Sequence, residues 1–192
     1  WHTSAHVLAQ AVKRLYPETK CAIGPAIENG FYYDFDFGFP FSDEHLSAIE
    51  EEMRKIVKES LSLQVSEKSR EEAIAYMEQA SEPYKLEMIR ELADDVRISF
   101  YKQGASEEFC AGPHISNVCQ IKAIKLLSVA GAYWRGDEKN PMLTRIYGIS
   151  FPKASQLEEY LHMLEEAKAR DHRKLGKELG IFTIFEEGPG LP

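Results

Sequence analysis

The sequence predicts an α+β fold, in which helices pack against an antiparallel sheet. Segments with a helical apolar period are mixed with segments whose apolar residues recur at every second position. Turn residues that suit hairpins separate the strand-like segments. No regular strand–helix–strand alternation, which a parallel sheet needs, runs through the chain. The chain has 192 residues, 44% of them hydrophobic and 28% charged, so it can bury a core without disulfides.

The first predicted element is a helix over residues 3–16. Its apolar residues follow the i, i+3, i+4, i+7 pattern of one helix face, and they are Ala5, Val7, Leu8, Ala11, Val12 and Leu15. Thr3 or Ser4 is expected to cap its first turn, and Pro17 ends it. A short amphipathic helix therefore begins the fold.

Residues 21–37 predict two strands around a turn. Gly24-Pro25 and Asn29-Gly30 are typical turn pairs. After them, aromatic residues alternate with acidic ones, as in a strand with one buried face, at Tyr33, Phe35 and Phe37. The segment is therefore expected to form a hairpin.

The middle of the chain predicts helices and strands in turn. Ser42 begins a helix, whose apolar face consists of Leu46, Ile49, Met53, Ile56 and Val57. Residues 62–68 predict a strand, and a capping box at 69–72 opens a helix to about residue 80. A further helix follows over 83–93, and then a strand over 95–104 with one apolar face formed by Val96, Ile98 and Phe100.

The last third predicts a hairpin and a long helix. Strands over 121–134 and 142–151 are joined by the polar turn "RGDEKNP". Residues 154–180 predict a charged helix of the connecting kind, and "IFTIFEEGPGLP" indicates the entry to another domain. We therefore expect a domain over 1–153, a linker helix over 154–180 and the start of a further domain over 181–192.

Composition excludes several classes of protein. No apolar run is long enough to cross a bilayer, and no signal peptide is visible. The chain begins without Met, and we expect both of its ends to be cut from a longer protein. Its net charge of −8 argues against polyanion binding by the whole surface, so nucleic acid must meet local basic patches. Three Cys without a C-x-x-C pair indicate a reducing compartment.

Two closely spaced pairs of residues point to a reactive site. His2 and His6 lie four apart on the first predicted helix, so they project from one face. Cys110 and His114 flank "AGP" in "EFCAGPH", where a tight loop can turn both inward. Three His and one Cys are a sensible tetrahedral set for zinc. We expect the two pairs to share one site, although His2 with His6 can also be a plain surface pair and Cys110 a small buried residue.

The chemistry of such a site remains open between three alternatives. Zinc with an open coordination position can activate water. Without a metal, His and Cys can orient a water and move its protons. A closed set of four protein ligands would instead be structural, a clamp between the first helix and the central loop.

Several long strings resemble bacterial-type threonyl-tRNA synthetase. They are "HTSAH", "AIGPAIENGFYYDF", "CAGPH", "GAYWRGDEKNPMLTRIYG" and "RDHRKLGKELGIF", which together cover nearly the whole chain. The resemblance implies an editing domain followed by a linker helix, with "EEGPGLP" at the start of the catalytic domain. The two pairs also occur in alanyl-tRNA synthetase editing domains and their freestanding relatives, where they hold zinc. A freestanding zinc-dependent deacylase is therefore a second enzymatic reading.

The resemblance implies hydrolysis of mischarged seryl-tRNA(Thr). It assigns the editing pocket to His2, His6, Cys110 and His114, with catalytic or positioning roles for Lys85 and Glu108 and a pocket role for Tyr33. Glu108 stands where family members often carry Asp, and a Lys beside a Tyr, as in "EPYK", is otherwise usually a solvated surface residue. The resemblance favours a pocket that works without a tightly held metal.

The resemblance also implies partners. The 3′ end of tRNA(Thr) carrying serine must reach the pocket, and a single strand suits stacking and cationic contacts. Tyr133, Trp134 and Arg135 are candidates for binding the terminal base, although Trp134 can equally pack in the core. Further basic candidates, each of which can also be solvated surface, are Lys13, Arg14, Lys20, Lys122, Lys125 and Arg145. The full enzyme is expected to be a cytoplasmic homodimer without membrane contact, with its ATP and a zinc in the catalytic domain.

Overall fold

The computed structural model describes residues 1–170 of the chain. It contains a compact unit from Trp1 to Pro152 and a second unit that begins at Lys153. Within the second unit, α5 (Ala154–Ala169) is a helix without a fully buried residue. The remainder of the expected linker helix and the expected start of a further domain over 181–192 lie outside the described residues. None of the helices within residues 1–170 could cross a membrane.

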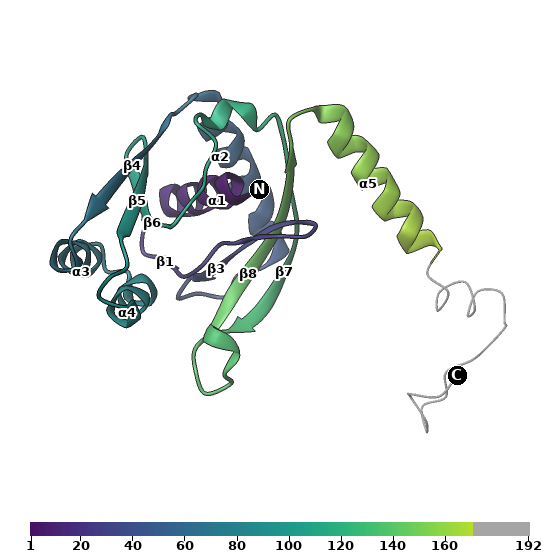
Figure 1. The fold of residues 1–192 in the computed structure, drawn as a ribbon. Helices are drawn as coiled ribbons and strands as arrows, with labels where there is room; N and C mark the ends of the chain where they lie inside the picture. Colours follow the sequence, from purple (N-terminus) through teal and green to yellow (C-terminus); the bar gives the residue numbers. More distant parts are fainter. Residues whose placement is uncertain (171–192) are drawn as a thin grey trace, which may run out of the picture. The chain divides into compact units, whose positions relative to one another are not determined.

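The larger of two sheets has five strands, all paired antiparallel. Its order is β1 (Lys20–Cys21), β3 (Gly30–Asp36), β8 (Met142–Phe151) and β7 (Ala123–Tyr133), and β2 (Ala26–Ile27) also pairs with β3. The predicted hairpin of 21–37 is confirmed, because Ile27 pairs with Gly30 across a two-residue turn. The β7–β8 hairpin is confirmed too, and it is the longest feature of the sheet (Figure 1).

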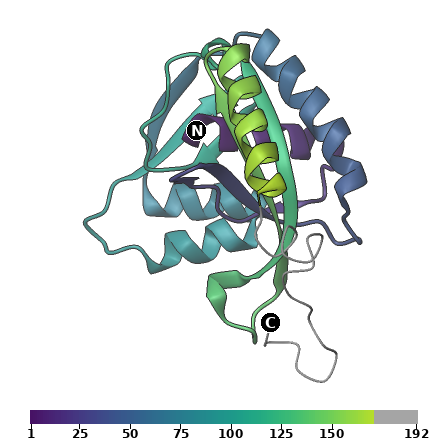
Figure 2. The same ribbon diagram turned by 90° about the vertical axis from the view of Figure 1, so that its right-hand side faces the viewer.

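Two helices cover one face of this sheet. They are α1 (His2–Leu15) and α2 (Leu46–Lys58), and the short helix η1 (Asp43–His45) leads into α2. Figure 2 shows α2, in blue, alongside the long β7–β8 hairpin. All residues of α1 from Thr3 to Val12 are buried, as expected of a helix enclosed on all sides. The predicted cap is wrong, because Trp1 occupies the N-cap position and Thr3 and Ser4 lie inside the helix.

A smaller, three-stranded sheet carries two helices of its own. The strands β4 (Leu63–Lys68), β5 (Ile98–Gln103) and β6 (Ser106–Phe109) pack with α3 (Arg70–Gln79) and α4 (Pro83–Glu91). The capping box at the start of α3 is confirmed, with Ser69 and Glu72 bonded reciprocally. The strand β6 was not predicted. Val96 does not belong to the apolar face of β5, because it precedes the strand and is exposed.

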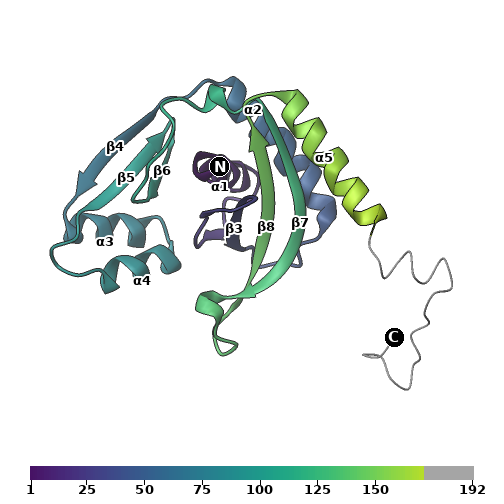
Figure 3. The same ribbon diagram turned by 45° about the vertical axis from the view of Figure 1, so that its right-hand side comes forward.

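The prediction of an α+β fold with antiparallel pairing is confirmed, but the strands form two sheets where one was expected. The helix α1 lies between the two sheets (Figure 3). Polar contacts join the two halves around it. Glu82, before α4, accepts the backbone N–H of Cys21 at 2.8 Å and pairs with Lys13 of α1 at 2.8 Å. Tyr84 donates to Asp36 of β3 at 3.0 Å.

Candidate functional site

The two predicted pairs meet in the structure between the sheets. His2 and His6 project from α1, and Cys110 and His114 come from the loop after β6. We call these four residues the His/Cys cluster. The sulfur of Cys110 lies 3.2 Å from Nε2 of His2 and 3.3 Å from Nε2 of His114. One ligand atom from each of the four lies within 4.8 Å of the others. Residues more than a hundred positions apart therefore form one site.

The loop that carries Cys110 is fixed to strand β5. The backbone N–H of Cys110 donates to the carbonyl of Ser99 at 3.1 Å, and the Ser99 hydroxyl donates to the carbonyl of Cys110 at 2.6 Å. Gly112 has φ +72°, and a Cβ there would overlap the hydroxyl of Tyr101. The loop thus needs glycine both for its backbone conformation and for space. The ring of Tyr101 then lies 4.4 Å from that of His114, centroid to centroid.

Two histidines of the cluster contact polar side chains outside it. Nδ1 of His114 lies 3.1 Å from the Thr3 hydroxyl, and Nδ1 of His6 lies 3.5 Å from a carboxylate oxygen of Glu108. Such outer partners orient metal-binding histidines in many proteins. They leave the opposite edges of the rings for the centre of the cluster.

The donor set fits a zinc ion. In a tetrahedral zinc site, bonds of 2.0–2.3 Å place the ligand atoms roughly 3.3–3.8 Å from one another. The two distances from the Cys110 sulfur to imidazole nitrogens, 3.2 and 3.3 Å, are close to this range. Three imidazoles and one thiol are also ligands that zinc prefers. The cluster can therefore hold zinc with small adjustments.

A buried network of charges borders the cluster. One oxygen of Glu108 lies 3.4 Å from Nζ of Lys85 and accepts a hydrogen bond from the Tyr33 hydroxyl at 3.2 Å. The same oxygen faces His6, so the network and the cluster are continuous. Lys85 is only 4% exposed, against the expectation for a lone surface lysine. Burying either charge alone would cost free energy. Each group therefore stabilises the other in its buried position.

Burial sets the protonation of the cluster. It lowers the pKa of His6 well below its usual value, and the nearby charge of Lys85 lowers it further. Burial likewise lowers the pKa of His114 to about 3 and the pKa of His2 below its usual value. Burial raises the pKa of the Cys110 thiol. Near neutral pH the cluster therefore holds neutral imidazoles and a thiol.

Lys85 remains a cation despite its position. Burial alone would lower its pKa, but the negative charge of Glu108, with smaller effects from Cys21 and Glu82, keeps that pKa above the usual value. A cavity of about 300 Å³ reaches Lys85 and Glu108, and its walls also include Lys13, Glu82 and Glu107. This volume lies at the lower end of the range for small-molecule sites. The walls of this cavity carry three carboxylates as well as cations, and they do not include the His/Cys cluster.

The candidates for binding a terminal base lie apart from the cluster. Trp134 is buried, packs against the ring of Tyr84 and donates its indole N–H to Glu87 of α4. Arg135 pairs with Glu87 at 3.0 Å and with Glu91 at 2.5 Å. Trp134 therefore packs in the core, as the alternative interpretation has it. Tyr133, in contrast, exposes 44% of its surface.

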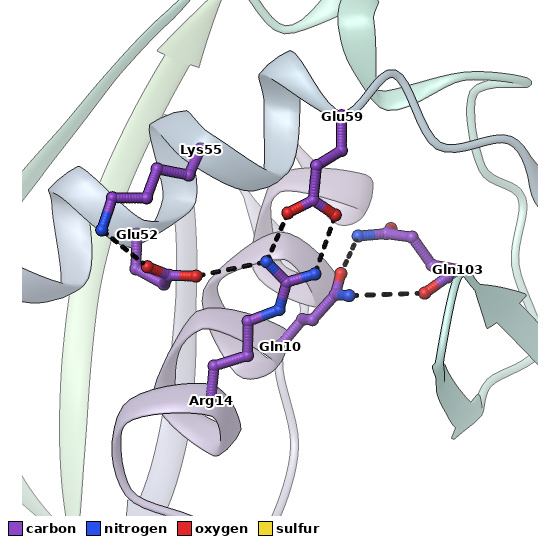
Figure 4. Close-up of polar contacts among 6 residues, drawn as sticks. All are labelled: Gln10, Arg14, Glu52, Lys55, Glu59 and Gln103. Atoms are coloured by element: carbon purple, nitrogen blue, oxygen red, sulfur yellow. Dashed lines mark hydrogen bonds and ion pairs between the residues drawn. The ribbon is translucent and has the colours of Figure 1, made fainter.

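Most basic candidates for RNA contact are already paired with acids. Arg14 binds Glu59 with both terminal nitrogens and also reaches Glu52 (Figure 4). Lys13 pairs with Glu82, Lys125 with Glu50, and Arg145 with Asp34. Within residues 1–170, Lys20 and Lys122 are the candidates whose side chains have no such ion pair described. Most of the basic side chains proposed for RNA contact are therefore neutralised by neighbouring carboxylates.

Known proteins match this chain over its whole length. The family model described as the threonyl and alanyl tRNA synthetase second additional domain matches residues 98–147. Threonine–tRNA ligases match all of the chain, with 65% identity over 192 residues in Caldanaerobacter subterraneus subsp. tengcongensis and 68% over 191 in Clostridium tetani. Over its whole length, the chain is similar to one region of threonine–tRNA ligases. It spans about 30% of the length of each of these relatives.

The threonine–tRNA ligase from Acetivibrio thermocellus is 63% identical over 191 residues and is likewise covered over 30% of its length. The region matched by the family model includes Glu108, Cys110 and His114. The remaining residues of the site precede that region, namely His2, His6, Tyr33 and Lys85. The matches to the threonine–tRNA ligases cover the whole chain, so they include the site residues inside and before that region.

Sequence reasoning missed several residues that shape the site. Thr3 was expected to cap a helix, whereas its hydroxyl contacts His114. Tyr101 lies against the same ring, and Gly24 lies against Tyr33, where a Cβ would overlap the tyrosine ring. The turn pair Gly24-Pro25 indicated a bend, but no pattern in the sequence pointed to these contacts.

Proposed function

We propose that the site hydrolyses the ester bond of seryl-tRNA(Thr), the product in which serine has replaced threonine. The observation that carries this proposal is the position of the His/Cys cluster beside the buried Lys85–Glu108 pair, in a chain similar to threonine–tRNA ligases. Neutral bases beside a fixed cation are parts that ester hydrolysis needs.

A separate hydrolytic site is needed because one binding pocket discriminates poorly between serine and threonine. Serine lacks one methyl group of threonine, and one methyl contributes only about 1–3 kcal/mol of discrimination in a binding pocket. An enzyme that attaches threonine will therefore also attach some serine. A hydrolytic pocket that admits the smaller amino acid and excludes the larger one removes the error.

His6 is suited to act as the general base. Its ring is neutral near pH 7, and its Nδ1 faces the carboxylate of Glu108 at 3.5 Å. The carboxylate holds the ring in place while the other nitrogen takes a proton from water. Attack on the ester carbonyl then breaks the bond to the ribose oxygen. His6 returns the proton to that oxygen, and serine leaves.

Lys85 is suited to stabilise the oxyanion of this reaction. The ammonium is buried, fixed by Glu108 and positively charged, so it contributes more here than it would in water. Tyr33 holds Glu108 from the other side, because burial keeps its pKa well above the usual value and its hydroxyl donates to the carboxylate. If zinc is bound, His2, His6, Cys110 and His114 would hold it as a closed set of four ligands, whose role would be structural.

The test is a deacylation assay with the full 192-residue chain. We expect release of serine from seryl-tRNA(Thr) and little release of threonine from threonyl-tRNA(Thr). His6→Gln and Lys85→Met should each lower the rate by about 10²–10⁴-fold, the usual contribution of a positioned acid–base group. Equal rates on the two esters would contradict the proposal, and so would full activity of both variants.

A structural zinc clamp is the alternative that the closed set of four ligands favours. Removal of the metal from such a site should lower the melting temperature steeply. The hydrolytic proposal expects a chelator to leave the fold intact. Metal analysis and melting curves, before and after treatment with the chelator, distinguish the two.

The remaining roles belong to the larger protein. We infer that the chain works within a threonine–tRNA ligase whose other parts attach threonine to tRNA(Thr) with ATP and form a homodimer. The high identity to threonine–tRNA ligases, of which it spans about 30%, supports this placement over a freestanding deacylase. Restoring those other parts should increase the affinity for seryl-tRNA(Thr), which filter binding can measure.

A further inference from the structure

The second half of β7 is an open edge of the larger sheet. β7 ends the strand order, so one of its sides has no neighbouring strand among residues 1–170 (Figure 3). Before the β-bulge this side is covered, because Glu50 of α2 accepts the backbone N–H of Leu126 at 3.0 Å. After the bulge, residues 128–133 are mostly exposed and include no charged residue and no proline. We call residues 128–133 the open edge.

The other strand edges of the described residues are protected. An exposed edge is a template for pairing with a further strand, and proteins usually avoid this with short strands, charged side chains or a covering element. At the opposite side of the larger sheet, β1 and β2 have two residues each. In the smaller sheet, β4 and β6 both contain charged residues. The open edge is therefore the edge within residues 1–170 that is best suited to bind a strand.

The register of the hairpin shows which backbone groups of the open edge point away from β8. In an antiparallel pair, successive residues direct their N–H and C=O alternately towards the paired strand and away from it. Trp134 donates its backbone N–H across the hairpin to Pro141 at 3.0 Å. Counting back from Trp134, the outward residues are Tyr133, Gly131 and Val129. Among the described residues, these outward groups have no hydrogen-bond partner.

The pattern of outward residues is self-complementary. Two copies related by a two-fold axis at Gly131 can place Val129 of one copy opposite Tyr133 of the other, with the two glycines opposite each other. Each of these pairs joins outward residues, so each can exchange two backbone hydrogen bonds. A β-branched residue opposite an aromatic one is also a stabilising cross-strand pair. The axis generates this pair twice.

We propose that two copies of this chain associate through their open edges, in antiparallel pairing about Gly131, so that the larger sheet continues from one copy into the other. Met142 of β8 is 65% exposed and lies beside Gly131, where a Cβ would come within 3.0 Å of its sulfur. The pairing brings the two methionines together near the axis and covers them. The contact is short, so the dimer belongs to the weak, transient class. It does not depend on the proposed hydrolysis.

Sedimentation equilibrium of the full 192-residue chain measures this association. We expect a reversible monomer–dimer equilibrium, which becomes tighter when salt screens the net charge of −8 on each copy. Met142→Lys and Met142→Glu each place like charges near the axis, so each variant alone should dimerise about 10-fold more weakly or worse. An equimolar mixture of the two variants should recover the dimer, because unlike charges then meet at the axis.

A matched control and a second measurement locate the contact. Met163→Lys makes the same change at an exposed methionine of α5 and should leave the association unchanged. Amide hydrogen exchange, followed by NMR, should show protection of Val129, Gly131 and Tyr133 that increases with protein concentration. The inward amides of Ala130 and Ala132, which face β8, should be protected at every concentration.

Several results would overturn the inference. They are a chain that stays monomeric up to about 1 mM, an association that Met142→Lys leaves unchanged, and a mixture of the charged variants that fails to dimerise. If the open edge instead binds a strand from another part of a threonine–tRNA ligase, this chain remains monomeric and the proposal fails. If the variants do not fold, the concentration dependence of the wild-type outward amides decides.

Discussion

Tyr33 shows how a single side chain in the site depends on neighbours that have no reactive groups. Its ring stacks on Phe35 with 4.7 Å between centroids, and its hydroxyl reaches Glu108. Gly24 also lies against this ring, and any Cβ there would overlap it. Tyr33 can therefore occupy this position only because residue 24 is glycine.

Gly24→Ala should displace the ring of Tyr33. We expect a loss of about 1–3 kcal/mol in the free energy of unfolding from the overpacking. The loss in seryl ester hydrolysis should be larger, up to about 10²-fold, because small misplacements of site groups are costly to catalysis. Urea unfolding and the deacylation assay measure the two effects. Gly131→Ala is the matched control, since its added methyl would meet only the flexible end of Met142. Equal effects of the two substitutions would refute the account.

At the scale of elements, α2 supports the irregular part of the long hairpin. The register between β7 and β8 shifts between Leu126 and Ser128, which marks a β-bulge. Glu50 of α2 is buried there and accepts the backbone N–H of Leu126 at 3.0 Å. Its carboxylate also pairs with Arg54 and Lys125. A charge in the core is thus balanced by three donors.

Replacing Glu50 should separate its roles. Glu50→Ala leaves the N–H of Leu126 without a partner, at a cost of about 1–3 kcal/mol in the free energy of unfolding. Glu50→Gln keeps an oxygen acceptor and should cost less. Glu51→Ala, at an exposed position of the same helix, should change stability by no more than about 0.5 kcal/mol. A Glu50→Ala chain as stable as Glu50→Gln in chemical denaturation would show that the N–H needs no acceptor.

Most elements could be predicted from the sequence because their signals are local. The apolar period of α1, the capping box at Ser69 and the alternation in β3 each depend on residues within a few positions. Strand β6 has four residues and lies next to the Cys/His loop, so its pattern is too short to recognise. The cap at Thr3 was predicted wrongly because a tertiary contact with His114 competes for the same hydroxyl.

The whole molecule explains why the site could be predicted only in part. The spacing of His2 with His6, and of Cys110 with His114, indicated two pairs with suitable chemistry. That they meet depends on α1 lying between two sheets, which no local pattern encodes. The chemistry of the two pairs led us to expect one shared site, and the resemblance to threonyl-tRNA synthetase added Lys85. The sequence did not reveal that one carboxylate, Glu108, contacts His6, Lys85 and Tyr33 together.

The unit from Trp1 to Pro152 should fold without the residues that follow it. All of the hydrophobic clusters described within residues 1–170 belong to this unit, and α5 buries none of its residues. A chain that ends at Pro152 should therefore melt within a few degrees of the full chain and hydrolyse seryl-tRNA(Thr) at a similar rate. Circular dichroism and the deacylation assay test both points. Loss of cooperative melting in the shortened chain would show that later residues are part of the core.

The placement of α1 has a consequence for how ligands act on the molecule. An aminoacyl ester in the site would touch groups supplied by α1 and by the loop after β6. A ligand that binds only when both halves are in place stabilises that arrangement by mass action. A non-hydrolysable seryl-adenosine analogue should accordingly slow hydrogen exchange in β5 and β6. Substrate binding would then stabilise the association of the two halves that form the site.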